Sequence, residues 1–282
     1  MKHVLSTHLF ANQKLTVAWL DRIDDAGIPA VEIFCAKQHF DWRDASQVNE
    51  LGYWFRDRKL KLHSVHSPMY TDNVWGRSGP QSVLTITEPV KGKRNAMVDE
   101  IKRAIEVAER IPFRFLIQHF GVIHEEYDER KVDAAFNALD ELTLFAKQRD
   151  VEILIENTPN ALSSAERLTL FNTQTHMGIN FCFDVGHAHI HGGVEAEFEI
   201  MKDRIRSTHI HDNNGKDDQH LFPLVSEGGS IAWNKTMDLL RSGTEYPLLL
   251  ELKEVPEMEK PLDAVREVFE RLENLRSANE RE

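Results

Sequence analysis

The feature that most constrains this chain of 282 residues is a regular alternation of short β-branched runs with amphipathic helical segments. Strands are predicted at 3–9, 30–35, 60–66, 113–119, 151–156, 179–184, 205–211 and 247–252. Helices are predicted at 15–26, 46–58, 94–110, 129–149, 163–174, 194–203, 231–242 and 262–276. Such alternation indicates βαβ units and a parallel sheet. Eight units suit a (β/α)₈ barrel, a fold that commonly has about 250 residues.

A doubly wound open sheet is the structural alternative, and the positions of the polar residues decide against it. Six predicted strands each have one such residue at or near the carboxyl end: His66, His119, Glu156, Asp184, His209 and Glu251. In a barrel these ends converge on one face, where the active sites of the fold lie. We therefore predict a single-domain α/β protein, a (β/α)₈ TIM barrel over residues 1–276, followed by a frayed tail at 277–282.

Composition agrees with a soluble globular protein and narrows its partners. Hydrophobic residues make up 41% and charged residues 28% of the chain, which is ordinary for globular domains. No apolar stretch reaches the roughly 18 residues of a membrane span, so a cytoplasmic protein without a membrane partner is expected. Cys35 and Cys182 lie in strand-like runs and are expected to be buried free thiols. The net charge of -12 disfavours non-specific binding to nucleic acid, although a local basic cleft is compatible with it.

The segment 206–220, Arg-Ser-Thr-His-Ile-His-Asp-Asn-Asn-Gly-Lys-Asp-Asp-Gln-His, is the richest in potential metal ligands. His209 and His211 are two residues apart, so on a strand their side chains share one face; Asp218 and His220 repeat this spacing after a turn. Neutral imidazole and carboxylate are the usual ligands of zinc and, with more oxygen, of manganese or magnesium. A polar surface loop is the alternative, which the number of ligand-type residues disfavours.

Two glutamates and one Asp-x-x-His element add to this picture. Glu156 and Glu251 each end an apolar run, where an unpaired carboxylate is costly, so a metal or a cationic partner is expected. A salt bridge to a barrel lysine is the alternative. In Asp184-Val-Gly-His187 the glycine is expected to turn the chain and return the histidine to the end of the strand.

The remaining histidines, aromatic residues and loop cations receive weaker assignments. His189 and His191 are expected to support the site or face solvent, and His63 to lie inside its strand. Structural roles are expected for His3, His8, His39, His124 and His176. The long loops 67–93 and 212–230 are expected above the site. Four aromatic residues could stack on a sugar face or on a base: Trp75, Trp42, Phe10 and Phe222. Phosphate could be contacted by five cations of these loops; the alternative is that they are solvated surface charges. They are Lys216, Arg77, Lys91, Lys93 and Arg94.

Together these residues resemble the xylose isomerase-like TIM-barrel superfamily, which includes sugar phosphate isomerases and epimerases and AP endonuclease family 2. The resemblance covers nearly the whole chain and is carried by Glu156-Asn-Thr-Pro, Asp184-Val-Gly-His187, His209-Ile-His-Asp-Asn-x-Gly and Glu251. In the epimerases one divalent ion, which for this chain would be Mn, Zn, Mg or Co, is held at positions that match Glu156, Asp184, His209 and Glu251.

The resemblance implies a metal-dependent sugar, sugar phosphate or polyol isomerase or epimerase that works by proton transfer through a metal-stabilised enediolate. Glu156 and Glu251 would be the catalytic proton carriers, and His187 would polarise the substrate. Endonuclease IV is the alternative within the superfamily, because five further positions match its multinuclear zinc site: His66, His119, His187, Asp218 and His220. A metal-binding barrel subunit without isomerase activity is a third hypothesis. The sugar, the metal, the acid and base assignment and any homo-oligomer are left open.

Overall fold

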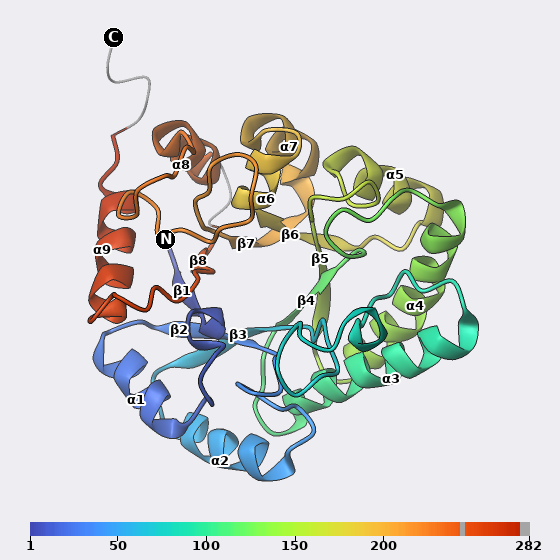
Figure 1. Ribbon diagram of the computed structural model, residues 1–282, viewed down its shortest axis with the longest axis horizontal. Helices are drawn as coiled ribbons and strands as arrows, with labels where there is room; N and C mark the ends of the chain where they lie inside the picture. Colours follow the sequence, from blue (N-terminus) through green and yellow to red (C-terminus); the bar gives the residue numbers. More distant parts are fainter. Residues whose placement is uncertain (243–245, 277–282) are drawn as a thin grey trace.

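Eight parallel strands in the order β7-β6-β5-β4-β3-β2-β1-β8 form the centre of the molecule, and helices surround them (Figure 1). The computed structural model describes residues 1–242 and 246–276. Strands β7 and β8 meet at a parallel bridge between Ile210 and Leu250. There the Ile210 N–H donates to Leu249 O at 2.8 Å, and the Glu251 N–H donates to Ile210 O at 3.2 Å. The sheet thus closes, which confirms the predicted (β/α)₈ barrel.

The strands are β1 (His3–Ser6), β2 (Ala30–Phe34), β3 (Lys61–His66), β4 (Phe115–His119), β5 (Glu152–Glu156), β6 (Asn180–Asp184), β7 (Ile205–His209) and β8 (Leu248–Leu250). The α-helices of the described residues are α1 (Val17–Asp25), α2 (Ala45–Arg56), α3 (Lys91–Glu106), α4 (Glu129–Lys147), α5 (Ala165–Thr175), α6 (Val185–Ile190), α7 (Val194–Met201), α8 (Trp233–Arg241) and α9 (Pro261–Glu273). None of these helices is long and apolar enough to cross a lipid bilayer.

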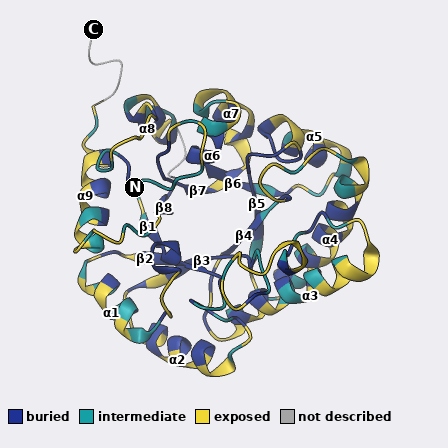
Figure 2. Ribbon diagram, in the orientation of Figure 1, coloured by how far each residue is buried: buried dark blue, intermediate teal, exposed yellow. Residues whose placement is uncertain are grey.

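The outer helices form because their sequences combine capping residues with one apolar face. Asp44 accepts the N–H groups of Ser46 and Gln47 at the start of α2, while Asp128 and Ser164 cap α4 and α5 in the same way. Such caps typically contribute about 1 kcal/mol each. Figure 2 shows buried residues on the sides of the helices that face the strands and exposed residues on the outside. The main core therefore lies between the helices and the barrel.

The barrel interior is filled with side chains below its carboxyl-terminal mouth. Phe115, Ile117, Leu154 and Cys182 pack together as a buried cluster inside the barrel. Because side chains alternate along a strand, Leu154 shares its face with Glu156, which lies one layer higher. Both Cys182 and Cys35 are buried and free, as predicted. The interior thus forms a floor beneath the strand ends.

Two local features differ from the predicted elements. Strand β1 ends at Ser6 rather than at residue 9, because Thr7–Phe10 forms a 3-10 helix in which Ser6 Oγ accepts the His8 N–H. The predicted turn after Asp184 is instead the start of the short helix α6, whose first turn the Asp184 carboxylate caps at His187 N. Gly186 is needed there, since a Cβ atom would lie 2.0 Å from the His211 ring. The predicted tail at 277–282 lies outside the described residues.

Candidate metal centre

Potential metal ligands gather at the carboxyl-terminal mouth of the barrel in three groups. Within each group the candidate atoms all lie within 4.8 Å of one another. The central group is Glu156, Asp184, His209 and Glu251; the second is His66, His119 and Glu156; the third is His187, His211, Asp218 and His220. Glu156 belongs to two groups, so these two share a carboxylate. The structure therefore brings together all nine residues that the sequence nominated as metal ligands or additional ligands.

Glu156 lies at the centre of this arrangement and is fully buried. Its Oε1 atom is 3.2 Å from His209 Nδ1 and 3.1 Å from His187 Nδ1. Its Oε2 atom is 3.2 Å from His119 Nε2 and 3.6 Å from His66 Nε2. Burial alone would raise the pKa of Glu156, but the surrounding imidazoles, His209 and His119 foremost, hold it well below its ordinary value. The carboxylate is therefore ionised across the physiological range.

His209 connects the central group to a buried glutamate on the other side of its ring. Its Nδ1 atom lies 3.3 Å from Glu251 Oε2 and 3.7 Å from Asp184 Oδ2. Its Nε2 atom lies 3.3 Å from Oε1 of Glu32, a fully buried residue of β2. Glu32 also accepts a hydrogen bond from Ser64 Oγ at 2.8 Å. With its proton on Nε2, His209 donates to Glu32 and presents the Nδ1 lone pair to the central group.

The third group is built around Asp218. Its Oδ2 atom lies 3.3 Å from His187 Nε2 and 3.2 Å from His220 Nε2. His211 stacks on His220 with ring centroids 4.0 Å apart, and its Nε2 atom is 3.1 Å from Asp184 Oδ1. Burial alone would lower the pKa of His220, but Asp218 in particular raises it to about 9. In the absence of metal, the Asp218 carboxylate and the protonated His220 ring stabilise each other.

Three of the imidazoles are oriented by backbone carbonyl groups. With the proton on Nδ1, each donates to a carbonyl oxygen at 2.9 Å: His66 to Ser67, His187 to Asn157 and His220 to Glu251. The Nε2 lone pair of each ring is then free to face the ligand group to which that histidine belongs. Metal-ligating histidines almost always donate their second ring N–H in this way, because the bond fixes the tautomer and the ring orientation.

The loop after β7 is folded around Asp212, which explains how Asp218 and His220 reach the site. Asp212 Oδ1 accepts the N–H groups of Ser230 and Ile231, and Oδ2 accepts the Trp233 indole N–H at 2.6 Å. These bonds hold the two ends of the loop together. His220 adopts a φ of 50° within it, so the loop turns back over the mouth of the barrel.

Several buried atoms of these groups make no hydrogen bond of acceptable geometry, although charged neighbours surround them. They include both carboxylate oxygens of Glu156, Nδ1 of His209 and Oδ1 of Asp218. Buried polar atoms without partners are costly, and each calls for an explanation. Divalent cations bound in the groups to which these atoms belong would satisfy them, and the mixed oxygen and nitrogen donors suit zinc, manganese, magnesium or cobalt. The residues present therefore fit a divalent metal.

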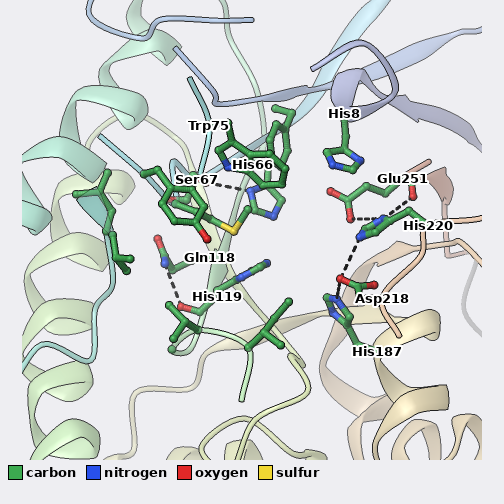
Figure 3. A pocket seen from close by; sticks show the side chains of 18 residues that line it. His8, His66, Ser67, Trp75, Gln118, His119, His187, Asp218, His220 and Glu251 are labelled. Carbon is green, nitrogen blue, oxygen red and sulfur yellow. Dashed lines mark hydrogen bonds and ion pairs between the residues drawn. The ribbon is translucent and has the colours of Figure 1, made fainter. Parts of the chain in front are cut away.

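A cavity of about 320 Å³ opens beside the groups. Figure 3 shows His187, Asp218, His220 and Glu251 together on one side of it, with Trp75 and Gln118 across from them. Glu156 is absent from the lining residues and lies beneath the cavity. Of the two predicted proton carriers, Glu251 is thus the one whose side chain lines the cavity.

Three ionisable residues of this region were left out of the predicted ligand set. His211 belongs to the third group; its spacing of two from His209 marked it as a potential ligand, but it matched none of the nine ligand positions. His8 was assigned a structural role but lines the cavity, next to the His220 ring. Burial and the neighbouring His220 hold the pKa of His8 well below its ordinary value, so His8 is neutral. Glu32 lies within a strand and gave no strand-end signal.

Other sequence assignments are corrected by the structure. Of the four aromatic residues proposed for stacking, Trp75 lines the cavity, whereas Trp42, Phe10 and Phe222 are buried in the main core. None of the five proposed phosphate contacts lines it: Lys216, Arg77, Lys91, Lys93 and Arg94. His189 and His191 contact Ser230 and Glu197 outside the three groups, as expected.

Known proteins resemble this chain over most of its length. An uncharacterised protein of Methanocaldococcus jannaschii, MJ1311, is 27% identical, and the match covers 96% of this chain and 90% of that protein. The crystal structure of a D-tagatose 3-epimerase-like protein is 24% identical with a TM-score of 0.76, over 97% of this chain and 98% of that one. The structure of the IOLI protein with a bound zinc atom is 16% identical with a TM-score of 0.73, over 96% and 98%. These two structural similarities establish the fold of this chain.

The family model described as xylose isomerase-like TIM barrel matches residues 20–275. This match includes β2 to β8 and every residue of the three groups. The chain therefore belongs to the xylose isomerase-like TIM-barrel family.

Proposed function

We propose that the protein is a divalent-metal-dependent isomerase or epimerase of a sugar or related polyol. The observation that carries this proposal is the central group of Glu156, Asp184, His209 and Glu251 beside a closed-in cavity at the carboxyl-terminal mouth of the barrel. The sugar epimerases among the proteins of similar fold support it. The zinc atom bound in the IOLI protein supports the metal.

A divalent ion in the central group would polarise the carbonyl oxygen of a ketose and the neighbouring hydroxyl oxygen. This would acidify the C–H bond of the hydroxyl-bearing carbon next to the carbonyl group. Glu251, on the cavity wall, removes that proton, and the electron pair of the C–H bond moves to the carbonyl oxygen to give an enediolate. His187 donates a hydrogen bond to the substrate oxygen. Return of the proton by Glu251 to the former carbonyl carbon, while the proton of the neighbouring hydroxyl passes to the enediolate oxygen, completes an isomerisation. An epimerisation requires a second carrier on the opposite face, a role for which Glu156 stays the predicted residue.

A metal-dependent phosphodiesterase of the endonuclease IV kind is the second candidate. One observation favours it: the second and third groups are fully assembled, although an isomerase needs only the central one. Two observations weigh against it. No lysine or arginine within 1–242 and 246–276 lines the cavity, and the chain carries a net charge of -12. Binding of a DNA backbone, in contrast, depends on cationic side chains. Nicking of abasic-site DNA by the metal-loaded protein at catalytic rates would replace the isomerase proposal.

The proposal is tested by product formation. Metal-loaded protein is incubated with a panel of aldoses and ketoses, free and phosphorylated, and the sugars are separated chromatographically. We expect a new isomer or epimer from at least one sugar and none from metal-free protein. Absence of any product across the panel, with metal bound and the protein folded, counts against the isomerase. The remaining hypothesis is then a barrel that binds metal without isomerase activity.

Replacing Glu32 with glutamine is expected to weaken metal binding about 10- to 100-fold, the usual effect of losing a hydrogen-bond partner of a metal-bound histidine. The amide cannot stabilise the Nε2 proton of His209 as a carboxylate does. Calorimetric titration of the metal-free protein with Zn²⁺ or Mn²⁺ measures the change. Glu152→Gln, at the amino-terminal end of β5, is the matched control. Equal affinities for wild type and Glu32→Gln would show that Glu32 does not position His209.

Metal binding is expected to release protons, because carboxylate neighbours raise the pKa of His66, His187, His209 and His220 in the metal-free protein. His220, whose pKa is raised to about 9, carries a proton at pH 7 and must lose it to bind a metal. Apparent metal affinity should therefore rise with pH up to about 9 and fall at lower pH. Titration in buffers with different ionisation enthalpies counts the released protons. Binding without proton release at pH 7 would exclude His220 as a ligand.

A further inference from the structure

The side of the cavity away from the metal groups is mostly apolar and carries no cationic side chain, and this feature restricts the substrate. Among the described residues, no lysine or arginine lines the cavity. The apolar residues come from one strand end and two loops: Phe34 at the end of β2, then Met69, Tyr70, Trp75, Val83 and Leu84 after β3, and Val122 with Ile123 after β4. Resting on the proposed function, we propose that the substrate is an unphosphorylated ketose or polyol whose end remote from the chelating oxygens is an apolar group, such as a terminal methyl.

The first part of this apolar wall is held in place by backbone pairing. Tyr70 and Val83 form an antiparallel bridge, and the Leu84 N–H donates to Met69 O at 2.8 Å. The Trp75 ring lies edge-on to Tyr70 at 5.9 Å between ring centroids, and to Phe34 at 5.4 Å. The wall is therefore preformed and does not need the ligand to order it.

The second part of the wall is fixed by side chains that lie outside the cavity. Asn160 donates to Phe120 O at 3.2 Å and to Val122 O at 3.1 Å. The Glu125 carboxylate accepts the Val122 N–H at 2.8 Å. Glu125 also pairs with Lys131 at 2.9 Å, so its charge is already compensated. This loop presents Val122 and Ile123 to the cavity without offering it a cation.

The polar side chains of the lining do not change this conclusion. The histidines, Asp218 and Glu251 belong to the metal groups or border them. Gln118 donates its amide N–H to His119 O at 3.0 Å. Within the described part of the chain, Gln118 Oε1, Ser67 Oγ and Trp75 Nε1 have no hydrogen-bond partner and can contact sugar hydroxyls, but none of them carries a positive charge. A phosphate requires charge-assisted donors such as arginine or lysine, and a hydroxyl buried against aliphatic carbon loses its hydrogen bonds to water. A methyl group in the same place is stabilised by burial.

Three ketohexoses that differ only at C6 test the inference: the parent sugar, its 6-deoxy derivative and its 6-phosphate, each in every available configuration. Binding to metal-loaded protein is measured by calorimetry, and turnover by product formation. For the configuration that binds, we expect the 6-deoxy sugar to bind at least about tenfold tighter than the parent sugar. We expect the 6-phosphate to bind more than about 100-fold weaker than the 6-deoxy sugar.

A substitution on the rim of the wall provides a matched comparison. Ile123 lines the cavity and is 42% exposed, so Ile123→Lys adds an ammonium group without disturbing the core. We expect this variant to gain affinity for the 6-phosphate at least about tenfold. Leu144→Lys, at an exposed position of α4, adds the same charge elsewhere and should have no effect.

The outcomes separate the inference from the proposed function. Turnover with the 6-phosphate preferred over the 6-deoxy sugar, or with all three equal, would overturn the inference and leave the isomerase standing. Failure of every ketose to bind or turn over would remove the isomerase and the inference with it.

Discussion

Replacement of Glu156 by glutamine is expected to abolish the activity and to weaken metal binding by more than about 100-fold. Loss of a hydrogen-bond partner of a metal ligand already costs about 10- to 100-fold, and Glu156 would itself be a ligand of two groups. The amide keeps the size of the side chain but removes the charge that faces His209, His187 and His119. Elemental mass spectrometry of protein purified without chelator, together with product formation, measures both effects.

The control for this variant lies on the same strand. Glu152 starts β5 and Glu156 ends it, and the Glu152 carboxylate accepts the Asn180 side-chain amide at 2.6 Å. Glu152→Gln is therefore the same chemical change at the opposite end of the barrel, and should retain metal and activity. A Glu156→Gln protein that keeps wild-type metal content and turnover would contradict the role assigned to the shared carboxylate.

Removal of the metal is expected to end the activity completely and to lower the melting temperature by about 10 °C. An ion present at about 1,000 times its dissociation constant stabilises the folded state by about 4 kcal/mol. For a chain of this size, each kcal/mol corresponds to roughly 2–4 °C in melting temperature. The metal-free protein should nevertheless remain folded, because protonated imidazoles then neutralise the buried carboxylates.

Chelation, dialysis and thermal unfolding followed by circular dichroism measure this prediction. Adding back one metal at a time should restore both the melting temperature and the turnover, and the most effective metal identifies the native one. An unchanged melting temperature together with unchanged turnover after complete removal of metal would mean that the groups serve no metal-dependent function.

The sequence was sufficient to predict the barrel and the gathering of the candidate ligands at its mouth, because one physical constraint produces both signals. A buried parallel strand is a short apolar run, and its carboxyl end is where a polar side chain first meets the mouth of the barrel. Glu156 and Asp184 each end a strand in the structure as predicted, and His209 ends β7, for which the prediction extended to residue 211. The resemblance to the superfamily, with its nine matched ligand positions, also pointed to residues of the second and third groups. The periodicity of the strands alone would not have linked these residues to the site.

What the sequence did not predict depends on contacts between distant segments. Glu32 lies in the middle of β2, and its relation to His209 is a contact across 177 residues of sequence. The loop after β7 takes its shape from Asp212, which accepts hydrogen bonds from residues 18, 19 and 21 positions later. No local pattern encodes such pairings.

The aromatic residues illustrate the same limit. Trp75 lines the cavity, whereas Trp42, with a comparable position in a predicted loop, is 4% exposed in the main core. An aromatic side chain in a connection is stabilised by burial on either side of that connection. The choice between core and cavity is therefore made by the packing of the whole loop, which a single sequence does not reveal.

The account rests on metal-dependent proton transfer at a carbon next to a carbonyl group, and solvent-deuterium exchange tests this most directly. The panel of ketoses is incubated in deuterated water with metal-loaded wild type, metal-free wild type and metal-loaded Glu251→Gln, and the sugars are analysed by mass spectrometry and NMR. We predict that one carbon-bound deuterium enters the sugar beside its carbonyl carbon with the metal-loaded wild type, and none with the other two samples. Absence of deuterium from every ketose with folded, metal-loaded wild type, or equal incorporation without metal, would contradict the account.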